Sequence, residues 1–198
     1  MVLVDREVPG VEADFIESNH EEGGYLATRY LVELGHRRIA CVSGPEHLQP
    51  SRDRVAGYRQ ALQEAHIAFD PVLLVYSDFT SEGGFNAFGD LLKLPMPPSA
   101  IFASNDLMAI GGICAAAEAK VNVPQQLSVI GYDDIALASY STPRLTTMSQ
   151  PKYAMGEMIT RLLLARIAGG HLPLRRELLQ TTLVERQSTA RLRNPGSS

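Results

Sequence analysis

Short runs of β-branched and aliphatic residues alternate along this chain with longer segments in which apolar residues recur every three or four positions. Runs of the first kind are typical of buried strands, and segments of the second kind are typical of amphipathic helices. Strands separated by helical segments predict βαβ units, which form a parallel sheet with helices on both faces. The sequence therefore predicts an α/β fold with a doubly wound, mainly parallel sheet.

The predicted elements cover most of the chain. We expect strands at 2–4, 38–42, 72–76, 100–103 and 127–131, and helices at 19–35, 51–65, 81–93, 105–120 and 151–169. A last extended stretch, ELLQTTLVER, spans residues 177–186. Ser18 or Asn19 is expected to cap the first helix, and Gly35 to end it.

The composition excludes several classes of protein. The chain has 198 residues, 45% of them hydrophobic, which is enough for one large core or two small ones. Its net charge is -4 with both signs interspersed, unlike the basic face of a DNA-binding module. No apolar run is long enough to cross a membrane. Cys41 and Cys114 lie in apolar segments, and we expect both to be buried free thiols.

Polar and aromatic side chains follow the predicted strands where each strand ends or the next helix begins. In an open α/β sheet, ligands bind outside the carboxyl ends of the strands. The candidates offer carboxylate, guanidinium, carboxamide and aromatic groups, and they are Asp5, Arg6, Arg54, Phe79, Asn105, Asp133 and, on a later loop, Gln150. A polyol needs this combination, because each hydroxyl both donates and accepts and the C–H face packs on a ring.

The segment SVIGYDDIALASYS places two carboxylates side by side. We interpret Asp133 as a ligand residue and Asp134 as the cap of the short helix IALASY. Asn105 is predicted to bind the ligand, to cap the helix that follows it, or to do both. Asp106 is expected to be a favourable charge in the first turn of that helix. The five histidines, at positions 20, 36, 47, 66 and 171, are expected at the surface.

The sequence lacks the motifs of several enzyme classes. It has no GxGxxG, no Walker A sequence, no GxSxG elbow and no His/Cys cluster with zinc spacing. A phospho-acceptor site would need a lysine after a strand, and the only lysines are at 93, 120 and 152. We therefore predict a protein that is not an enzyme and has no cofactor and no metal. The alternative is an enzyme of similar fold that acts on sugar phosphates, which would need a cationic phosphate pocket.

Three segments resemble the effector-binding core of the lac-repressor family of bacterial transcription regulators, which is similar to periplasmic sugar-binding proteins. They are LVELGHRRIACVSGPEHLQPSRDRVAGYRQAL, AIFASNDLMAIGG and VPQQLSVIGYDDIALASYSTPRLTTMSQP. The resemblance covers residues 1–190. It implies a cytoplasmic regulator that holds a small-molecule effector between two lobes and binds operator DNA. A fragment of a periplasmic sugar-binding protein is the alternative.

Within this family the ribose-type pattern fits best. The Asp-Arg that ends the first strand is matched by Asp5 and Arg6, and the arginine of RxxGY by Arg54. The remaining ribose-type positions are matched by Phe79, Asn105, Asp133 and Gln150. The resemblance therefore implies a ribose-like sugar as effector. A purine is the other possibility, because purine-binding members share several of these residues.

The resemblance also implies how the chain is divided. Residues 19–145 would form the C-terminal lobe, 1–18 and 146–175 fragments of an incomplete N-terminal lobe, 176–190 a return to the C-terminal lobe, and 191–198 a tail. The family's N-terminal DNA-binding headpiece has no counterpart here, so operator DNA would be bound only through that part. We expect this chain to form one wall of the effector site and to bind sugar weakly or not at all.

Two features predict a homodimer. Val2–Val4 are expected to form an unpaired strand edge. The helix at 151–169 has an apolar stripe that is expected to face the rest of the N-terminal lobe: Met155, Ile159, Leu162, Leu163 and Ile167. Exposed apolar faces and strand edges favour association.

Overall fold

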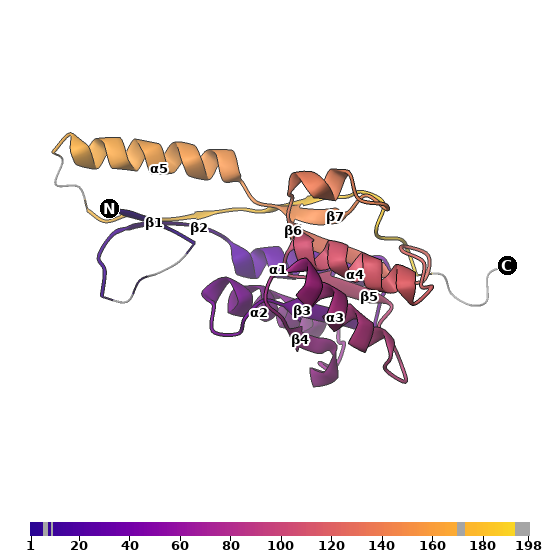
Figure 1. Ribbon diagram of the computed structural model, residues 1–198. Helices are drawn as coiled ribbons and strands as arrows, with labels where there is room; N and C mark the ends of the chain where they lie inside the picture. Colours follow the sequence, from indigo (N-terminus) through magenta and orange to yellow (C-terminus); the bar gives the residue numbers. More distant parts are fainter. Residues whose placement is uncertain (6–7, 9, 170–172, 193–198) are drawn as a thin grey trace.

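The computed structural model describes residues 1–5, 8, 10–169 and 173–192, and its strands form two sheets (Figure 1). The larger sheet has six strands in the order β4-β3-β5-β6-β7-β9, and the smaller has three in the order β1-β2-β8. The smaller sheet and α5 extend away from the body that is built on the larger sheet (Figure 1).

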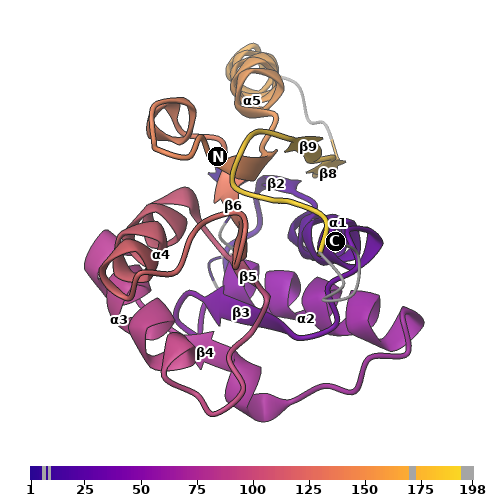
Figure 2. The same ribbon diagram turned by 90° about the vertical axis from the view of Figure 1, so that its right-hand side faces the viewer.

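The six-stranded sheet is parallel except for its last strand, β9, which runs antiparallel to β7. Two helices cover each face, as Figure 2 shows: α1 and α2 lie on one side, and α3 and α4 on the other. The predicted doubly wound α/β fold is confirmed. The strands are β3 (Ile39–Ser43), β4 (Leu74–Tyr76), β5 (Ala100–Ala103), β6 (Ser128–Asp133), β7 (Thr146–Ser149) and β9 (Thr182–Val184); the helices are α1 (His20–Glu33), α2 (Gln49–Glu64), α3 (Ser81–Leu92) and α4 (Asp106–Glu118), with 3-10 turns at Pro71–Leu73 and Ala136–Ser139.

The core follows from the central strands, which are buried along their whole length. Because side chains alternate between the two faces of a strand, each strand contributes residues to two hydrophobic clusters, one on each face of the sheet. Val42 and Ala103 pack on the side of α3 and α4, whereas Cys41 and Phe102 pack on the side of α1 and α2. This double burial fixes the sheet and aligns the carboxyl ends of β3, β5 and β6 at one edge.

The smaller sheet is parallel and consists of β1 (Val2–Val4), β2 (Asp14–Ser18) and β8 (Arg176–Leu179). Val2–Val4 pair with β2, a strand that the sequence pattern did not predict. Because β1 is the end strand of this sheet among the described residues, the expected open strand edge is confirmed on its other side. Helix α5 (Lys152–Ile167) covers one face, where Met155 and Leu162 pack on Ile16. Only part of the predicted α5 stripe therefore remains open to another partner.

Three segments of the chain pass between the two sheets. They join β2 to α1, β7 to α5, and β8 to β9. Strand β7, which follows the predicted boundary at 145, belongs to the larger sheet, and β8, which follows the predicted boundary at 175, belongs to the smaller one. At both places the chain therefore passes between the sheets one strand later than predicted. The division into lobes stays a prediction.

Helices α1 and α2 approach each other closely through two glycines. A Cβ atom on Gly24 would overlap the backbone carbonyl of Arg54, and one on Gly57 would overlap the carbonyl of Glu21. Glycine is required at both positions because no side chain fits between the two backbones. This close contact places the first turn of α1 beside Arg54.

Some expectations about burial were wrong. Cys41 is buried, which raises the pKa of its thiol to about 12, but Cys114 is exposed. His20 and His36 are buried rather than at the surface, whereas His47 and His66 are exposed; His171 lies outside the described residues. His36 bonds Ser99 Oγ and Ser128 Oγ, each at 3.0 Å. Among the described residues, no helix is long and apolar enough to cross a membrane.

Candidate functional site

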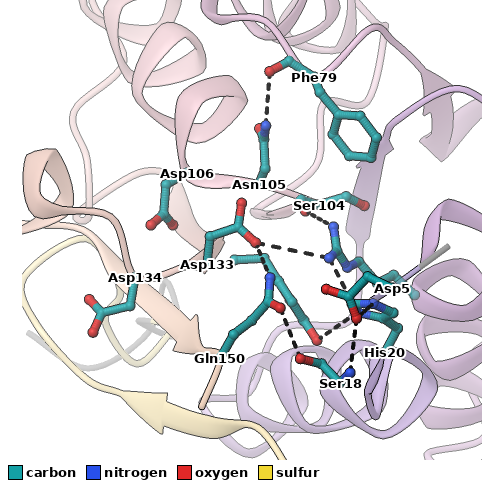
Figure 3. Close-up of polar contacts among 12 residues, drawn as sticks. Asp5, Ser18, His20, Phe79, Ser104, Asn105, Asp106, Asp133, Asp134 and Gln150 are labelled. Atoms are coloured by element: carbon teal, nitrogen blue, oxygen red, sulfur yellow. Dashed lines mark hydrogen bonds and ion pairs between the residues drawn. The ribbon is translucent and has the colours of Figure 1, made fainter. Parts of the chain in front are cut away.

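The structure brings five of the seven predicted ligand residues together around one recess of about 210 Å³. The recess is lined by Asp5, His20, Leu48, Pro50, Arg54, Phe79, Asn105 and Asp133. A sixth candidate, Gln150, lies beside it and donates from Nε2 to Asp133 Oδ1 at 2.5 Å. The seventh, Arg6, lies outside the described residues. Figure 3 shows how these side chains face one another.

Three of the lining residues have a backbone conformation that side chains other than glycine rarely adopt. The φ angles of Asp5, Phe79 and Asp133 are 51°, 66° and 109°. Each such residue costs about 1–3 kcal/mol and persists only where the surrounding structure enforces it. Positive φ turns these side chains out of the strand direction and toward the recess. Backbone strain is concentrated at functional sites more often than elsewhere.

Arg54 is the only described arginine that lines this recess, and its guanidinium is held on several sides. It is buried on α2, donates from Nη1 to the carbonyl of Ser104 at 2.7 Å, and stacks on Tyr132 with Cζ 3.9 Å from the ring centroid. Its Nη2 lies 3.9 Å from Asp133 Oδ1. The guanidinium is thus fixed in place, and its charge is balanced only in part within the recess.

The polar groups of the site form a closed ring of contacts, drawn as dashed lines in Figure 3. Ser18 joins its two ends: its N–H donates to Asp5 Oδ1 at 3.0 Å, and its Oγ donates to Gln150 Oε1 at 2.9 Å. The ring runs through Asp5, His20, Arg54, Asp133, Gln150 and back to Ser18. Ser18 and Gln150 lie on two of the passages between the sheets, so the ring couples the site to both.

The carboxyl groups of the site differ in their electrostatics. Burial alone would raise the pKa of Asp5, but the bonds from His20 and from the Ser18 N–H outweigh it and lower that pKa. Burial raises the pKa of Asp133, and Arg54 and Gln150 offset this only in part. Asp5 is therefore the more firmly ionised acceptor, whereas Asp133 would gain most from a ligand that replaces its lost water.

Asn105 both caps a helix and faces the recess. Its Oδ1 accepts from the Met108 N–H at 2.8 Å at the start of α4, and its Nδ2 donates to the carbonyl of Phe79 at 2.8 Å. An amide has two donor hydrogens and two acceptor lone pairs, so one of each remains for a ligand. The same bonds fix Phe79, whose ring lies against Gly44, where a Cβ atom would overlap it.

The prediction that Asp134 caps the following short helix was wrong. That turn begins at Ile135, whose N–H donates at 2.8 Å to Asp106 Oδ2, a carboxylate on a different element. Asp134 instead forms an ion pair with Arg186 at 2.6 Å. Asp106 lies in the first turn of α4, as expected, but it is buried, which raises its pKa to about 7 and opposes the expected charge. It also accepts from Thr147 Oγ1 at 2.5 Å.

Ser18, His20 and Tyr132 belong to the site but were not predicted. The unpredicted strand β2 explains the first two, because without its end at Ser18 nothing places Ser18 and His20 at the sheet edge. Tyr132 falls within β6, which extends two residues beyond the predicted end at 131. The only local sequence signal for this region was the helix-capping pair Ser18–Asn19, which stands just before His20 and the segment EEGG.

The recess can bind a small neutral ligand that is rich in hydroxyls. It offers ionised acceptors from Asp5 and Asp133, guanidinium donors from Arg54, an amide from Asn105 and a ring from Phe79. Among the described residues, no group of three or more His, Cys, Asp or Glu side chains is placed to hold a metal ion.

Comparisons with known proteins agree with this geometry. The family of periplasmic binding protein-like domains matches residues 28–189. A LacI family transcriptional regulator from Enterococcus faecium, solved with bound ribose, superimposes with a TM-score of 0.89 at 32% identity, over 97% of this chain and 71% of that one. The chain belongs to the LacI family. The predicted family and the predicted periplasmic-binding-protein-like fold are therefore confirmed.

Two other relatives of this LacI-family chain are named as repressors. The Ribose operon repressor of Escherichia coli (strain K12) is 45% identical over 177 residues, which cover 89% of this chain and 54% of the repressor. The HTH-type transcriptional repressor PurR of Klebsiella pneumoniae is 41% identical over 182 residues, covering 90% of this chain and 53% of that protein. The chain thus spans about half the length of these LacI-family relatives.

Proposed function

We propose that this chain supplies one wall of the effector site of a bacterial transcription regulator and that the effector is a ribose-like sugar. The observation that carries this proposal is the convergence of Asp5, Arg54, Phe79, Asn105 and Asp133 on one recess. The relatives support it, because one is named for the ribose operon and another was solved with ribose bound.

The chemistry of the recess favours a sugar over less polar ligands. Each sugar hydroxyl both donates and accepts, and the recess presents acceptors on Asp5 and Asp133 beside donors on Arg54. A hydrogen bond to a charged group contributes about 1.5–3 kcal/mol when it replaces an unsatisfied one. The partly buried ring of Phe79 can cover the C–H face of the sugar.

A purine base is the second candidate effector. The relative named PurR is 41% identical to this chain, and the recess has an aromatic ring next to an amide, which suits a planar base with polar edges. A purine base offers fewer hydroxyl donors to the carboxylates of Asp5 and Asp133 than a sugar does. The sugar therefore fits the charge distribution better.

The remaining functions are those of a regulator. We place it in the cytoplasm as a homodimer that acts on operator DNA through a headpiece outside these 198 residues, and we assign it no catalytic activity. The repressor names of the relatives favour this role over transport in the periplasm. A sugar-phosphate enzyme would need a cationic pocket for phosphate, and the only described cation that lines the recess is Arg54.

Calorimetric titration tests the proposal. The recess of about 210 Å³ is smaller than the roughly 300–1,000 Å³ of typical ligand pockets, so we expect D-ribose to bind with a Kd on the order of 1 mM. Hypoxanthine should bind less well than D-ribose, and ribose 5-phosphate should gain nothing from its phosphate. Stronger binding of the phosphate ester would favour the enzyme, and stronger binding of hypoxanthine would favour a purine effector.

A further inference from the structure

We propose that His20 is a positioning residue, which holds the Arg54 guanidinium apart from the Asp5 carboxylate so that both remain available to the effector. This role rests on the proposed function, since it concerns the same recess. His20 is the first residue of α1, follows the helix cap Asn19, and is 3% exposed. One nitrogen of its ring contacts Arg54 and the other contacts Asp5; Figure 3 shows His20 beside Asp5.

The contacts of His20 fix which nitrogen carries the proton. Its Nδ1 lies 3.2 Å from Arg54 Nη2, and a guanidinium can only donate, so Nδ1 must be the acceptor. The proton of the neutral ring is then on Nε2, which lies 3.3 Å from Asp5 Oδ1. The hydroxyl of Tyr132 lies 3.4 Å from Nδ1 and shares the single lone pair of that nitrogen with Arg54. This tautomer directs an acceptor toward Arg54 and Tyr132 and a donor toward Asp5.

His20 separates charged groups of opposite sign that come from different elements. Among the described residues, His20 faces Asp5 after β1, Arg54 on α2, Asp133 at the end of β6 and the Tyr132 hydroxyl. A second cavity that His20 also borders is lined by four more titratable residues, Glu17, Glu21, Asp53 and Arg176. Without His20, the opposite charges of Asp5 and Arg54 would attract each other across the vacated volume. A direct ion pair between them would consume the donor and the acceptor that the recess offers.

Two buried donors in the described residues that line the recess are left without a hydrogen-bond partner. Among the described residues, His20 Nε2 and Arg54 Nε make no hydrogen bond of good geometry, although both residues line the recess. A buried donor without a partner is costly in a part of the molecule that serves packing alone. His20 Nε2 lies 3.3 Å from Asp5 Oδ1, so a small turn of that carboxylate on binding a sugar hydroxyl would give Nε2 its partner.

The matched variants are His20→Asn, His20→Gln and His20→Ala, with the exposed His66→Asn as control. Asparagine places an acceptor where Nδ1 stood, whereas glutamine reaches the position of Nε2. In calorimetric titration with D-ribose, His20→Ala and His20→Gln should lose at least about tenfold in affinity, because each loses the acceptor for the Arg54 guanidinium. His20→Asn should stay within about threefold of the unsubstituted chain, as should His66→Asn.

A second readout does not depend on the ligand or on the folding of a variant. Two-bond ¹H–¹⁵N correlation of the chain labelled with ¹⁵N-histidine should show His20 with a protonated Nε2 and an unprotonated Nδ1. A protonated Nδ1 would overturn the positioning role, as would ribose affinity unchanged in His20→Ala or equally weak in His20→Asn. If the unsubstituted chain binds no ribose, the proposed function fails first; if it binds and His20→Ala binds equally, only the positioning role fails.

Discussion

Gln150 donates from Nε2 to Asp133 Oδ1 at 2.5 Å, and it accepts from Ser18 Oγ at 2.9 Å through its other amide atom. One side chain thus joins the carboxyl end of β6 to two of the three passages between the sheets. A ligand that donates hydrogen bonds to Asp133 must compete with Gln150 or rearrange it. Occupancy of the recess is therefore coupled to the passages about which the two sheets would move.

Asp133→Asn should weaken D-ribose binding at least about tenfold and change the free energy of unfolding by less than about 1 kcal/mol. The amide removes an ionised acceptor, yet asparagine tolerates the positive φ of 109° at this position. Calorimetry and urea unfolding measure the two effects. Asp90→Asn, at a side chain that is 79% exposed, is the matched control. Unchanged affinity in Asp133→Asn would remove this residue from the site.

Asp134→Asn should leave ribose binding unchanged and lower the free energy of unfolding by about 1 kcal/mol, because it breaks a partly buried ion pair with Arg186. Asparagine is chosen because the φ of Asp134 is 52°. Arg186→Gln should cost a similar amount, and the double variant little more than either. Additive losses in this double-mutant cycle would show that the two residues do not stabilise each other.

Asp106 should make stability depend on pH. Burial raises its folded pKa from 3.8 to about 7, so the folded state binds the proton more tightly than the unfolded state does. Its contribution is thus fully present below pH about 4, declines as pH rises to about 7, and is flat above that, with a total of at most about 4 kcal/mol. Asp106→Asn mimics the protonated form, since its amide can donate to Thr147 and accept from the Ile135 N–H.

Urea unfolding at pH 5 and pH 8 measures this effect. The difference in stability between Asp106→Asn and the unsubstituted chain should be larger at pH 8, in favour of the variant. Comparing the two chains cancels other groups, such as Asp14, whose pKa the bond from Arg166 lowers to about 2. A difference that does not change between the two pH values would show that Asp106 titrates normally in the folded protein.

Helix α5 should mediate a homodimer. Its outer surface exposes Leu164 by 62% and Ile167 by 79%, whereas its inner surface packs on the three-stranded sheet. Light scattering at high protein concentration should give twice the chain mass of 21.6 kDa. The double variant Leu164→Lys/Ile167→Lys should give the monomer mass, and Met96→Lys, at an equally exposed apolar residue, should not. A monomer in the unsubstituted chain at high concentration would contradict this prediction.

The strands that the sequence predicts well are those whose apolar residues are buried on both faces of the sheet. Ala100–Ala103 are apolar on both faces of the sheet, so the strand is evident from composition alone. Asp14–Ser18 and Thr146–Ser149 were not predicted because polar residues occupy buried positions in both. Asp14 is buried because Arg166 and the Arg175 N–H satisfy its carboxylate, and Thr147 because its hydroxyl reaches Asp106. Such pairings join residues distant in sequence, so local pattern does not reveal them.

In the candidate site too, the sequence identifies residues marked by their local position but not residues whose role depends on distant contacts. Asp5, Arg54 and Asn105 could be chosen because each stands just after a predicted strand or at the start of the next helix. His20 could not, since its role depends on α1 and α2 meeting at Gly24 and Gly57. The reassignment of Asp134 has the same cause, because Arg186 approaches it from 52 residues further along the chain.

The most direct test of the central claim is a residue-resolved NMR titration of the ¹⁵N-labelled chain with D-ribose. The account predicts saturable shift changes at the amides around Asp5, Asn105 and Asp133, with one dissociation constant, and their loss in Asp133→Asn. It also predicts smaller changes at Ser18 and Gln150, which the ring of contacts connects to the recess. No saturable change at up to roughly 50 mM ribose, or changes confined to another surface, would contradict it.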